Sequence, residues 1–540
     1  MPGVVRRAVR TLLQGSMPAV PQFDRRNLVK AGLSLSLLGG LGAPRLLARA
    51  TFTRDPFTLG IASGEPWPDG FVIWTRLAPE PQTPDGGMPP HDVPVRWEVA
   101  EDPGFRKIVR TGAAVAEAAL AHSVHVEVDG LRPHRPYWYR FLVAGAGASP
   151  IGTARTAPAA GASLDRLRLA LLGCQDFETG FFTAYAHVAR EPDLDVIFHY
   201  GDYIYEMAAR AEPSPRKHLG AETYTLDAYR RRYAQYKADP DLQAAHAAVA
   251  FIMSFDDHEI DDNWAGDFDK DGNPPAVFAR RKAAALQAWY EHVPVRRAQR
   301  PGANGTHAYR RLDYGTLARM HVLDTRSSRS DQLCERPGLP RAQLDACVPV
   351  DRRERTMLGA AQERWLDQGL ANRARWNFIA QQVMVMPYDA RKDGATTPLI
   401  GKDNWNGYPL SRQRLVDGIG RRGLTNVVIG SGDLHQNVIG SVPRTAEDVG
   451  GPAIATEFLA TSISSGGTGG LHYPGENRTL DNNPNVALLN NQRGYQLFTV
   501  TPDHWLAEVK VMDQVDRPGG SISTLAKFVV DPQQPGPQPG

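Results

Sequence analysis

The stretch LDVIFHYGDYIYEM, residues 194–207, restricts the fold more than any other part of the sequence. Its first half is apolar, as in a strand buried on both faces, and it stops at Gly201, Asp202 and two tyrosines. One interpretation is a polar strand end with tyrosines packed on the rim. The functional interpretation is that Asp202 and Tyr205 are placed together for chemistry at the carboxyl end of the strand.

Further apolar runs that end in polar or small residues follow the same pattern after residue 167. They are LRLALLGCQD (167–176), VAFIMSFDDHE (249–259), LARMHVLDTR (317–326), WNFIAQQVM (376–384) and NVVIGSGDLH (426–435). Helical stretches at 180–191 and 278–293 separate several of them. Apolar strands alternating with helices predict an α/β or α+β domain, over residues 158–525, whose sheets are flanked by helices.

Ligands of such open sheets bind beyond the carboxyl ends of the strands. The polar residues that end these runs are therefore expected at a common edge. They include Cys174, Asp202, Asp257 and Asp433.

Residues 51–157 have a different pattern, with short alternating runs rich in Val, Trp and Tyr. The runs are GFVIWTRL (70–77), VPVRWEVA (93–100), HSVHVEVDGL (122–131) and PYWYRFLVAG (136–145). This spacing predicts a small all-β sandwich, and DGLRPHRPYWYRF resembles fibronectin type III domains. The small-residue segment 152–163 is expected to be a linker.

The two ends of the chain are expected to lie outside the folded domains. Residues 1–50 contain Arg25 and Arg26 in RRNLVK, a short apolar run and a small-residue cleavage pattern, which resemble a Tat signal peptide. The alternative is a membrane anchor, but the run is short and rich in glycine. Export through the Tat machinery to the periplasm or medium is predicted, with no integral membrane segment in the mature protein. The proline- and glycine-rich tail, residues 526–540, is predicted to be disordered.

Charge and cysteine content further restrict the binding partners and cellular compartments that fit the sequence. With 61 basic and 59 acidic residues in 540, the net charge of +2 does not suggest specific nucleic-acid binding. Cys334 and Cys347 lie close together in a loop and suit a disulfide in an oxidising compartment. Cys174 is left without a partner.

Potential metal ligands gather at the predicted strand ends. A thiolate and a phenolate favour a trivalent or softer transition metal, whereas carboxylates and amides suit calcium or magnesium. A central carboxylate can bridge two metals, and bridged metals activate water and stabilise an in-line phosphoryl displacement. Asp202 would be that bridge and Tyr205 an anionic ligand. The other candidates are Cys174, Asp176, Asp256, Asp257, His258, Asn263, Asp433 and His435.

A second acidic motif does not meet the requirements of a calcium loop. DFDKDGNPPAVF, residues 267–278, begins with the spacing of an EF-hand, but Phe278 stands where a bidentate glutamate is needed. A surface turn is expected there.

Nine motifs stand in the order found in PhoD-like alkaline phosphatases, which the chain resembles over nearly all of its length after the signal. They are LLGCQDF, HYGDYIYE, DDHEIDDNW, RRKAAALQAWYEHVPVR, VLDTRSSR, LGAAQERWL, WNFIAQQV, GSGDLH and EFLATSISSGG. The resemblance implies a calcineurin-like metallophosphoesterase core behind the β-sandwich. The chain departs from the family after Arg326, where an expected aromatic residue is missing.

The resemblance also implies a site with Fe(III) and Ca(II) that hydrolyses phosphomonoesters and phosphodiesters. Cys174, Asp202 and Tyr205 would hold the iron, and calcium would share Asp202. The motifs further suggest Asp257 as a calcium ligand and Asp433 and His435 as ligands of a metal that the sequence does not specify.

Two further roles follow from the same motifs, each with a structural alternative. His258 would donate a proton to the leaving group, or the run that contains it would cap a helix. Arg326 would bind the phosphate, or would pair with Asp324. Asn263 is expected to be a turn residue.

The function expected from the sequence is therefore that of an exported, metal-dependent alkaline phosphatase with phosphodiesterase activity. One alternative is a phospholipase-like phosphodiesterase. Another is a non-catalytic binding protein on the same fold, which the presence of every candidate ligand disfavours. A relative of the purple acid phosphatases should have more histidines in its motifs.

Overall fold

The structure is a computed structural model that describes residues 52–302, 305–332, 353–371, 373–392, 394–396 and 398–540. The predicted signal peptide and the pair Cys334 and Cys347 lie outside these residues. Among the described helices, none is long and apolar enough to cross a bilayer.

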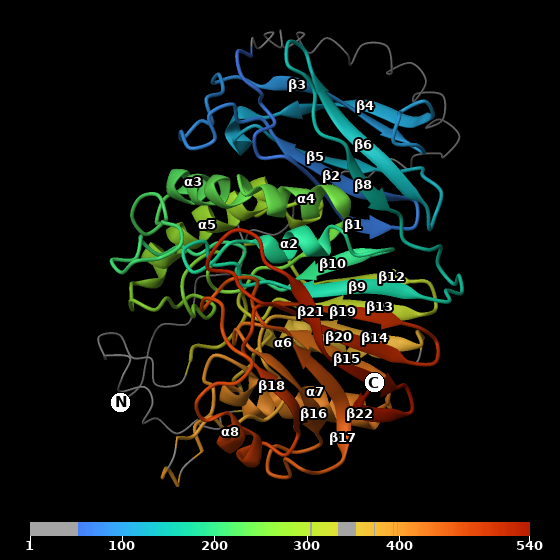
Figure 1. Cartoon of the computed structure of the whole chain (residues 1–540), viewed down its shortest axis with the longest axis vertical. Coiled ribbons are helices and arrows are strands. Elements are labelled where there is room, and N and C mark those ends of the chain that lie inside the picture. Colours follow the sequence, from blue (N-terminus) through green and yellow to red (C-terminus); the bar gives the residue numbers. More distant parts are fainter. Residues whose placement is uncertain (1–51, 303–304, 333–352, 372, 393, 397) are drawn as a thin grey trace, which may run out of the picture. The chain divides into compact units, whose positions relative to one another are not determined.

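Two large sheets form the centre of the structure (Figure 1). The first has ten strands in the order β22-β21-β20-β19-β9-β10-β11-β1-β2-β5, and the second has seven in the order β12-β13-β14-β15-β17-β16-β18. The first sheet contains β1 (Ile61–Trp67), β2 (Gly70–Arg76), β5 (Ser123–Val128), β9 (Leu167–Leu172), β10 (Val196–His199), β11 (Phe251–Met253), β19 (Gly494–Val500), β20 (Trp505–Met512), β21 (Ile522–Asp531) and β22 (Gln534–Pro539). The second contains β12 (Arg310–Tyr314), β13 (Ala318–Val322), β14 (Trp376–Ala380), β15 (Val427–Ser431), β16 (Asn437–Pro443), β17 (Ala453–Leu459) and β18 (Val486–Asn490).

The apolar runs found in the sequence are the central strands of these sheets. β9, β10 and β11 are parallel neighbours, and β13, β14 and β15 are parallel neighbours in the other sheet. Nearly all their side chains are buried, because each sheet is covered on both faces. The predicted α/β core is confirmed.

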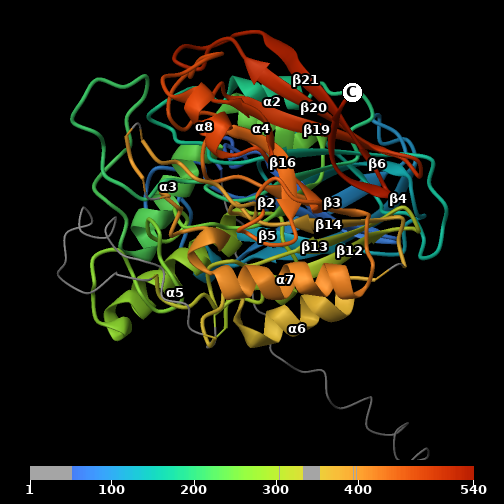
Figure 2. The ribbon, with the colours of Figure 1, turned by 90° about the horizontal axis from the view of Figure 1, so that it is seen from below.

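The hydrophobic core between the two sheets is formed by side chains such as Leu171, Phe198, Phe378, Val428 and Phe498. Helices cover the outer face of each sheet (Figures 1 and 2). The ten-stranded sheet packs against α2 (Thr183–Val188), α3 (Leu226–Lys237), α4 (Pro240–Ala248) and α5 (Pro275–His292). The seven-stranded sheet packs against α6 (Gly359–Gly369) and α7 (Pro409–Arg421), which lie side by side in Figure 2, and α8 (Glu476–Asn482) lies beside β18.

The N-terminal β-rich part is built as predicted but is not separated from the core by a break in the sheet. Its second sheet consists of β3 (Val93–Ala100), β4 (Ile108–Ala116), β6 (Pro136–Val143), β7 (Gly147–Ala148) and β8 (Gly152–Arg155). Apolar side chains fill the space between this sheet and β2 and β5. However, β1 pairs with β11 of the core, and β8 occupies the start of the segment expected to be a linker.

The prediction of a disordered tail over residues 526–540 is wrong. These residues form the end of β21 and all of β22, which pair with each other in an antiparallel ladder. Gly536 also donates its backbone N–H to Thr456 Oγ1 of β17 at 2.9 Å. β22 is the edge strand of its sheet, where prolines are tolerated because one side of the strand has no ladder bonds to lose.

Candidate metal centre

The candidate ligands come from strand ends of both large sheets rather than from one edge. Cys174, Asp202 and Asp257 follow β9, β10 and β11, whereas Asp433 and His435 follow β15 of the second sheet. They meet where the carboxyl ends of the two sets of parallel strands converge. The structure therefore brings together all six predicted metal ligands. Five of them belong to groups whose donor atoms lie within 4.8 Å of one another. The sixth, Tyr205, lies within hydrogen-bond distance of Asp202 and His435.

The backbone at these positions is unusual. Cys174, Asp202, Asp433 and His435 have φ angles of 52°, 55°, 71° and 60°, in the left-handed region that non-glycine residues seldom adopt. Such strain persists only where the surrounding structure enforces it, and it is concentrated at functional sites. Here it turns donor atoms from successive strands toward one point.

One half of the site contains the thiol, the phenol and an imidazole. Cys174 Sγ and Tyr205 Oη lie 3.2 and 3.1 Å from the same oxygen, Asp202 Oδ2. Tyr205 Oη is also 3.1 Å from His435 Nε2 and accepts a hydrogen bond from Ser465 Oγ at 2.7 Å. We refer to Cys174, Tyr205 and His435, with Asp202, as the thiolate–phenolate half.

The other half consists of carboxylates. Oxygens of Asp202, Asp256, Asp257 and Asp433 all lie within 4.8 Å of one another. We refer to this group as the carboxylate half. Asp202 is the member that the two halves share, as expected of a bridging ligand.

Buried acceptor atoms in this group have no hydrogen-bond donor among the described residues. They are Asp202 Oδ1, Asp256 Oδ2 and Asp257 Oδ1, and the last of these lies 3.5 Å from Arg326 Nη2. A buried charged oxygen without a partner is costly, and cation binding removes that cost. The residues present therefore fit a metal site. Sulfur, phenol and imidazole donors suit a transition metal in one half, and oxygen donors suit a hard cation in the other.

Burial and neighbouring charge shift the pKa values of the side chains in the thiolate–phenolate half. Burial raises the pKa of the Cys174 thiol well above its ordinary value, and the charge of Asp202 raises it further. Burial and the Asp202 carboxylate raise the pKa of Tyr205 in the same way. Burial lowers the pKa of His435 to about 3, so its imidazole is neutral and able to act as a ligand.

His258 lies beside the ligands and is held by a glutamate. Its Nδ1 is 2.8 Å from Glu206 Oε2, and its ring stacks on Tyr205 with the centroids 4.0 Å apart. Burial lowers the pKa of His258, but the charges of Glu206, Asp257 and Asp202 outweigh burial and raise it well above its ordinary value. The imidazole next to the metal ligands therefore favours its protonated form.

Arg326 is placed differently from the prediction that it binds phosphate. Its side chain is completely buried, and its Nε is 2.6 Å from Asp256 Oδ1. Its Nη1 and Nη2 lie 2.9 and 2.6 Å from the two oxygens of Asp403. The alternative partner, Asp324, contacts Arg326 through its backbone N–H alone and also accepts the N–H of Ser327. With its guanidinium enclosed by carboxylates, Arg326 does not present a free face to a substrate.

The two remaining candidates, Asp176 and Asn263, stabilise turns next to the site. Asp176 pairs with Arg210 at 2.7 Å and accepts the N–H of Glu178, so it stabilises the turn after Cys174. Asn263 has a φ of 55° and donates its N–H to Asp257 Oδ2, as expected of a turn residue.

The EF-hand-like segment forms no calcium loop of that type. Asp269 accepts two bonds from Asn273, and Phe278 is a buried residue of α5. Asp261, Asp269 and Asp271 do lie close together, but Lys270 Nζ is 3.3 Å from Asp261 and supplies a positive charge. Apart from Asp269, residues 267–277 are exposed or half-buried, as expected of a surface turn.

Sequence reasoning missed Glu206, Ser465 and Asp403. Glu206 and Ser465 both lie within the nine motifs, so their proximity to the strand ends was a usable signal. Asp403 lies in an irregular segment between β14 and α7, and its neighbours in the sequence give no indication of a role.

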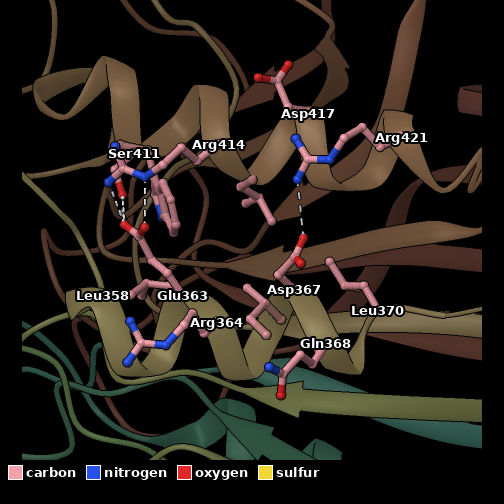
Figure 3. A pocket seen from close by; sticks show the side chains of 13 residues that line it. Leu358, Glu363, Arg364, Asp367, Gln368, Leu370, Ser411, Arg414, Asp417 and Arg421 are labelled. Atoms are coloured by element: carbon pink, nitrogen blue, oxygen red, sulfur yellow. Dashed lines mark hydrogen bonds and ion pairs between the residues drawn. The ribbon is translucent and has the colours of Figure 1, made fainter. Parts of the chain in front are cut away.

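A separate cavity of about 350 Å³ lies between α6 and α7 (Figure 3). Leu366, Leu370 and Trp405 are among its apolar lining residues, and the pair Glu363–Arg414 stands at its rim at 2.7 Å. None of the six candidate metal ligands lines it. Its position on the outer side of the second sheet separates it from the metal centre.

Two sheets that bring a shared aspartate, other acidic donors, a thiol and a phenol to one point are typical of a metal-dependent phosphoesterase. Sequence comparison agrees with this class. The family model of the PhoD-like phosphatases matches residues 169–509, and that of their N-terminal domain matches residues 43–158. The chain belongs to the PhoD-like phosphatase family and is a phosphoric ester hydrolase.

Individual relatives are similar over almost the whole chain. Alkaline phosphatase D of Bacillus subtilis (strain 168) is 42% identical over 529 residues, which cover 95% of this chain and 88% of the relative. A solved structure of PhoD has a TM-score of 0.86 and 42% identity, covering 91% of this chain and 93% of that one.

Proposed function

We propose that this phosphoesterase is an exported alkaline phosphatase that also cleaves phosphodiesters, with iron in the thiolate–phenolate half and calcium in the carboxylate half. The observation that carries this proposal is the position of Asp202. It contacts Cys174 and Tyr205 through one oxygen and lies within 4.8 Å of Asp257 and Asp433. A single carboxylate therefore joins two donor sets of different chemical character.

Different residues would bind each of the two metals. Cys174, Asp202, Tyr205 and His435 would hold the iron, and Asp202, Asp257 and Asp433 the calcium. When bound, such a pair of metals supplies an activated hydroxide and neutralises charge on the phosphoryl group.

His258 is proposed as the proton donor to the leaving group. Glu206 fixes the ring through Nδ1, so Nε2 is the nitrogen left to face the reaction. Because the neighbouring carboxylates raise its pKa, the imidazole retains a proton at higher pH than a free histidine. Arg326 has no part in binding substrate in this proposal.

Export is supported by Arg25 and Arg26 in RRNLVK, followed by an apolar run and the small-residue pattern that ends at Ala50. Tat export of the folded protein to the periplasm or medium is accordingly proposed. This route is tested by replacing both arginines with lysine. The variant should remain in the cytoplasm as the full-length precursor, whereas the wild type should yield mature protein outside.

The activity is tested by hydrolysis of an aryl phosphomonoester and a bis-aryl phosphodiester at alkaline pH with calcium, before and after chelation. Cleavage of both that is lost on chelation is the expected result. The ratio of the two rates separates a phosphatase from a diesterase. Cleavage of long-chain phospholipids at a much higher rate than either would favour the phospholipase-like alternative. Activity that survives removal of all metal would contradict the proposed site.

A further inference from the structure

Arg326 occupies a position in which a positive charge is surrounded by carboxylates. Its guanidinium contacts Asp256 at 2.6 Å and Asp403 at 2.6 and 2.9 Å. Two further oxygens, of Asp257 and Asp433, lie 3.5 and 3.9 Å from Nη2. The side chain itself has no solvent exposure.

The carboxylate half needs such a charge before any metal binds. Asp202, Asp256, Asp257 and Asp433 bring their oxygens within 4.8 Å of one another, and all but Asp433 are buried. Like charges this close in a region of low dielectric constant repel strongly, and buried charges are stable only when they are paired. Arg326 is the cation that contacts three members of this group.

A link to a distant segment holds the arginine in this position. Asp403 is bound by both nitrogens of the Arg326 fork and also by Arg329 Nη1 at 2.6 Å. Such a forked contact fixes the plane of a guanidinium. Asp403 therefore orients Arg326, whose Nε then points at Asp256.

We propose that Arg326 is a positioning residue that serves as a built-in cation, holding the carboxylate half assembled when divalent cations are absent and leaving it ready to take them up. This inference rests on the divalent-cation site of the proposed function. In this inference Arg326 acts on the metal ligands rather than on the substrate, and Asp403 orients Arg326.

The test compares the melting temperature of the purified full-length protein loaded with calcium and after a chelator has removed divalent cations. In Arg326→Gln the carboxylates lose the guanidinium that contacts three of them, so bound calcium must compensate more of their charge. The difference in melting temperature between loaded and stripped protein should be roughly twofold larger than in the wild type. A second readout is calorimetric titration of the stripped protein with calcium, which should give a lower Kd in the variant, because a larger calcium-dependent stabilisation requires tighter binding.

Arg329→Gln is the matched control, because it also removes a contact to Asp403 while leaving the contacts of Arg326 to Asp256 and Asp257 in place. It should lower the melting temperature of loaded and stripped protein by similar amounts. Arg326→Lys keeps the charge and should restore most of the wild-type behaviour. Asp403→Asn weakens the contact that orients Arg326, so the difference between loaded and stripped protein should grow, though by less than in Arg326→Gln.

Equal destabilisation of the loaded and stripped forms by Arg326→Gln would show a merely structural role and overturn the inference. If that variant does not fold, Asp403→Asn decides the question, because its loaded-to-stripped difference must rise above that of the wild type. A wild-type protein whose melting temperature is unaffected by calcium would instead contradict the divalent site itself. The two failures are therefore distinguishable.

Discussion

The two halves of the metal centre share Asp202 but stabilise their buried groups in different ways. In the thiolate–phenolate half, Cys174, Tyr205 and His435 can all be neutral, and they form hydrogen bonds with one another or with Asp202. In the carboxylate half the donors are carboxyl groups close enough to repel one another when ionised, and Arg326 supplies a balancing charge.

From this difference we expect the thiolate–phenolate half to tolerate the loss of its metal better than the carboxylate half. A thiol and a phenol that retain their protons keep hydrogen bonds when no metal is bound, whereas carboxylates leave unpaired oxygens. Metal binding to the first half must also release protons, because burial and nearby charge raise the pKa values of Cys174 and Tyr205. The two halves should therefore respond differently to pH and to substitution.

Replacing the shared ligand should have the largest effect. Asp202→Ala removes a donor from both halves, and loss of at least a hundredfold in kcat/KM is expected, beyond the range of about 10–100-fold typical of residues outside the ligand shell. Circular dichroism should show that the fold is retained. Asp271→Ala, at an exposed carboxylate of the other acidic cluster, is the control and should keep wild-type activity. Wild-type turnover by Asp202→Ala would rule out the bridging role.

Substitutions confined to one half should separate the two metals. Cys174→Ser is expected to reduce bound iron while calcium binding persists, and Asp257→Asn should reduce calcium affinity by about 10–100-fold while iron persists. Elemental analysis of the purified variants measures both metals at once, so each variant controls for the other. Loss of both metals in both variants would mean that the halves do not bind independently.

A smaller change within the thiolate–phenolate half tests the phenolate. Tyr205→Phe removes the hydroxyl that contacts Asp202, His435 and Ser465, and any absorption band from a phenolate bound to iron should disappear. A loss of activity of about 10-fold is expected. The control is Tyr203→Phe, whose hydroxyl bonds to His246 instead. Persistence of the band in Tyr205→Phe would point to another tyrosine.

The smallest expected effect is a shift in pH dependence. If protonated His258 is the active form, activity falls as pH rises through its pKa, which Glu206 helps to keep high. Glu206→Gln removes that charge, so the pKa falls and the alkaline loss of activity should move to lower pH by about one unit.

The kcat/KM of an alkyl phosphate, which needs a proton on its leaving group, should show this shift more clearly than that of an aryl phosphate. Glu222→Gln is the matched control, because Glu222 pairs with Lys270 and Arg281 instead of His258. An unchanged profile in Glu206→Gln would remove His258 from the role of proton donor.

Much of the fold could be predicted because apolar runs must be buried. The stretch around residues 194–200 forms a strand between two parallel neighbours, and the segment expected to be helical at 278–293 lies almost entirely within α5. The tail was mispredicted because its prolines suggested disorder. An edge strand tolerates prolines, and whether a strand lies at an edge depends on its neighbours in the sheet.

The sequence by itself determined the chemical types of the donors and the strand ends that carry them, because both are local properties of short motifs. Tertiary structure decided how they combine. Arg326 lies 70 residues from Asp256 and 77 from Asp403, and it comes from a different sheet than Asp256. No local pattern indicates whether a guanidinium will face a substrate or a group of carboxylates, because that depends on which buried charges the folded chain brings next to it.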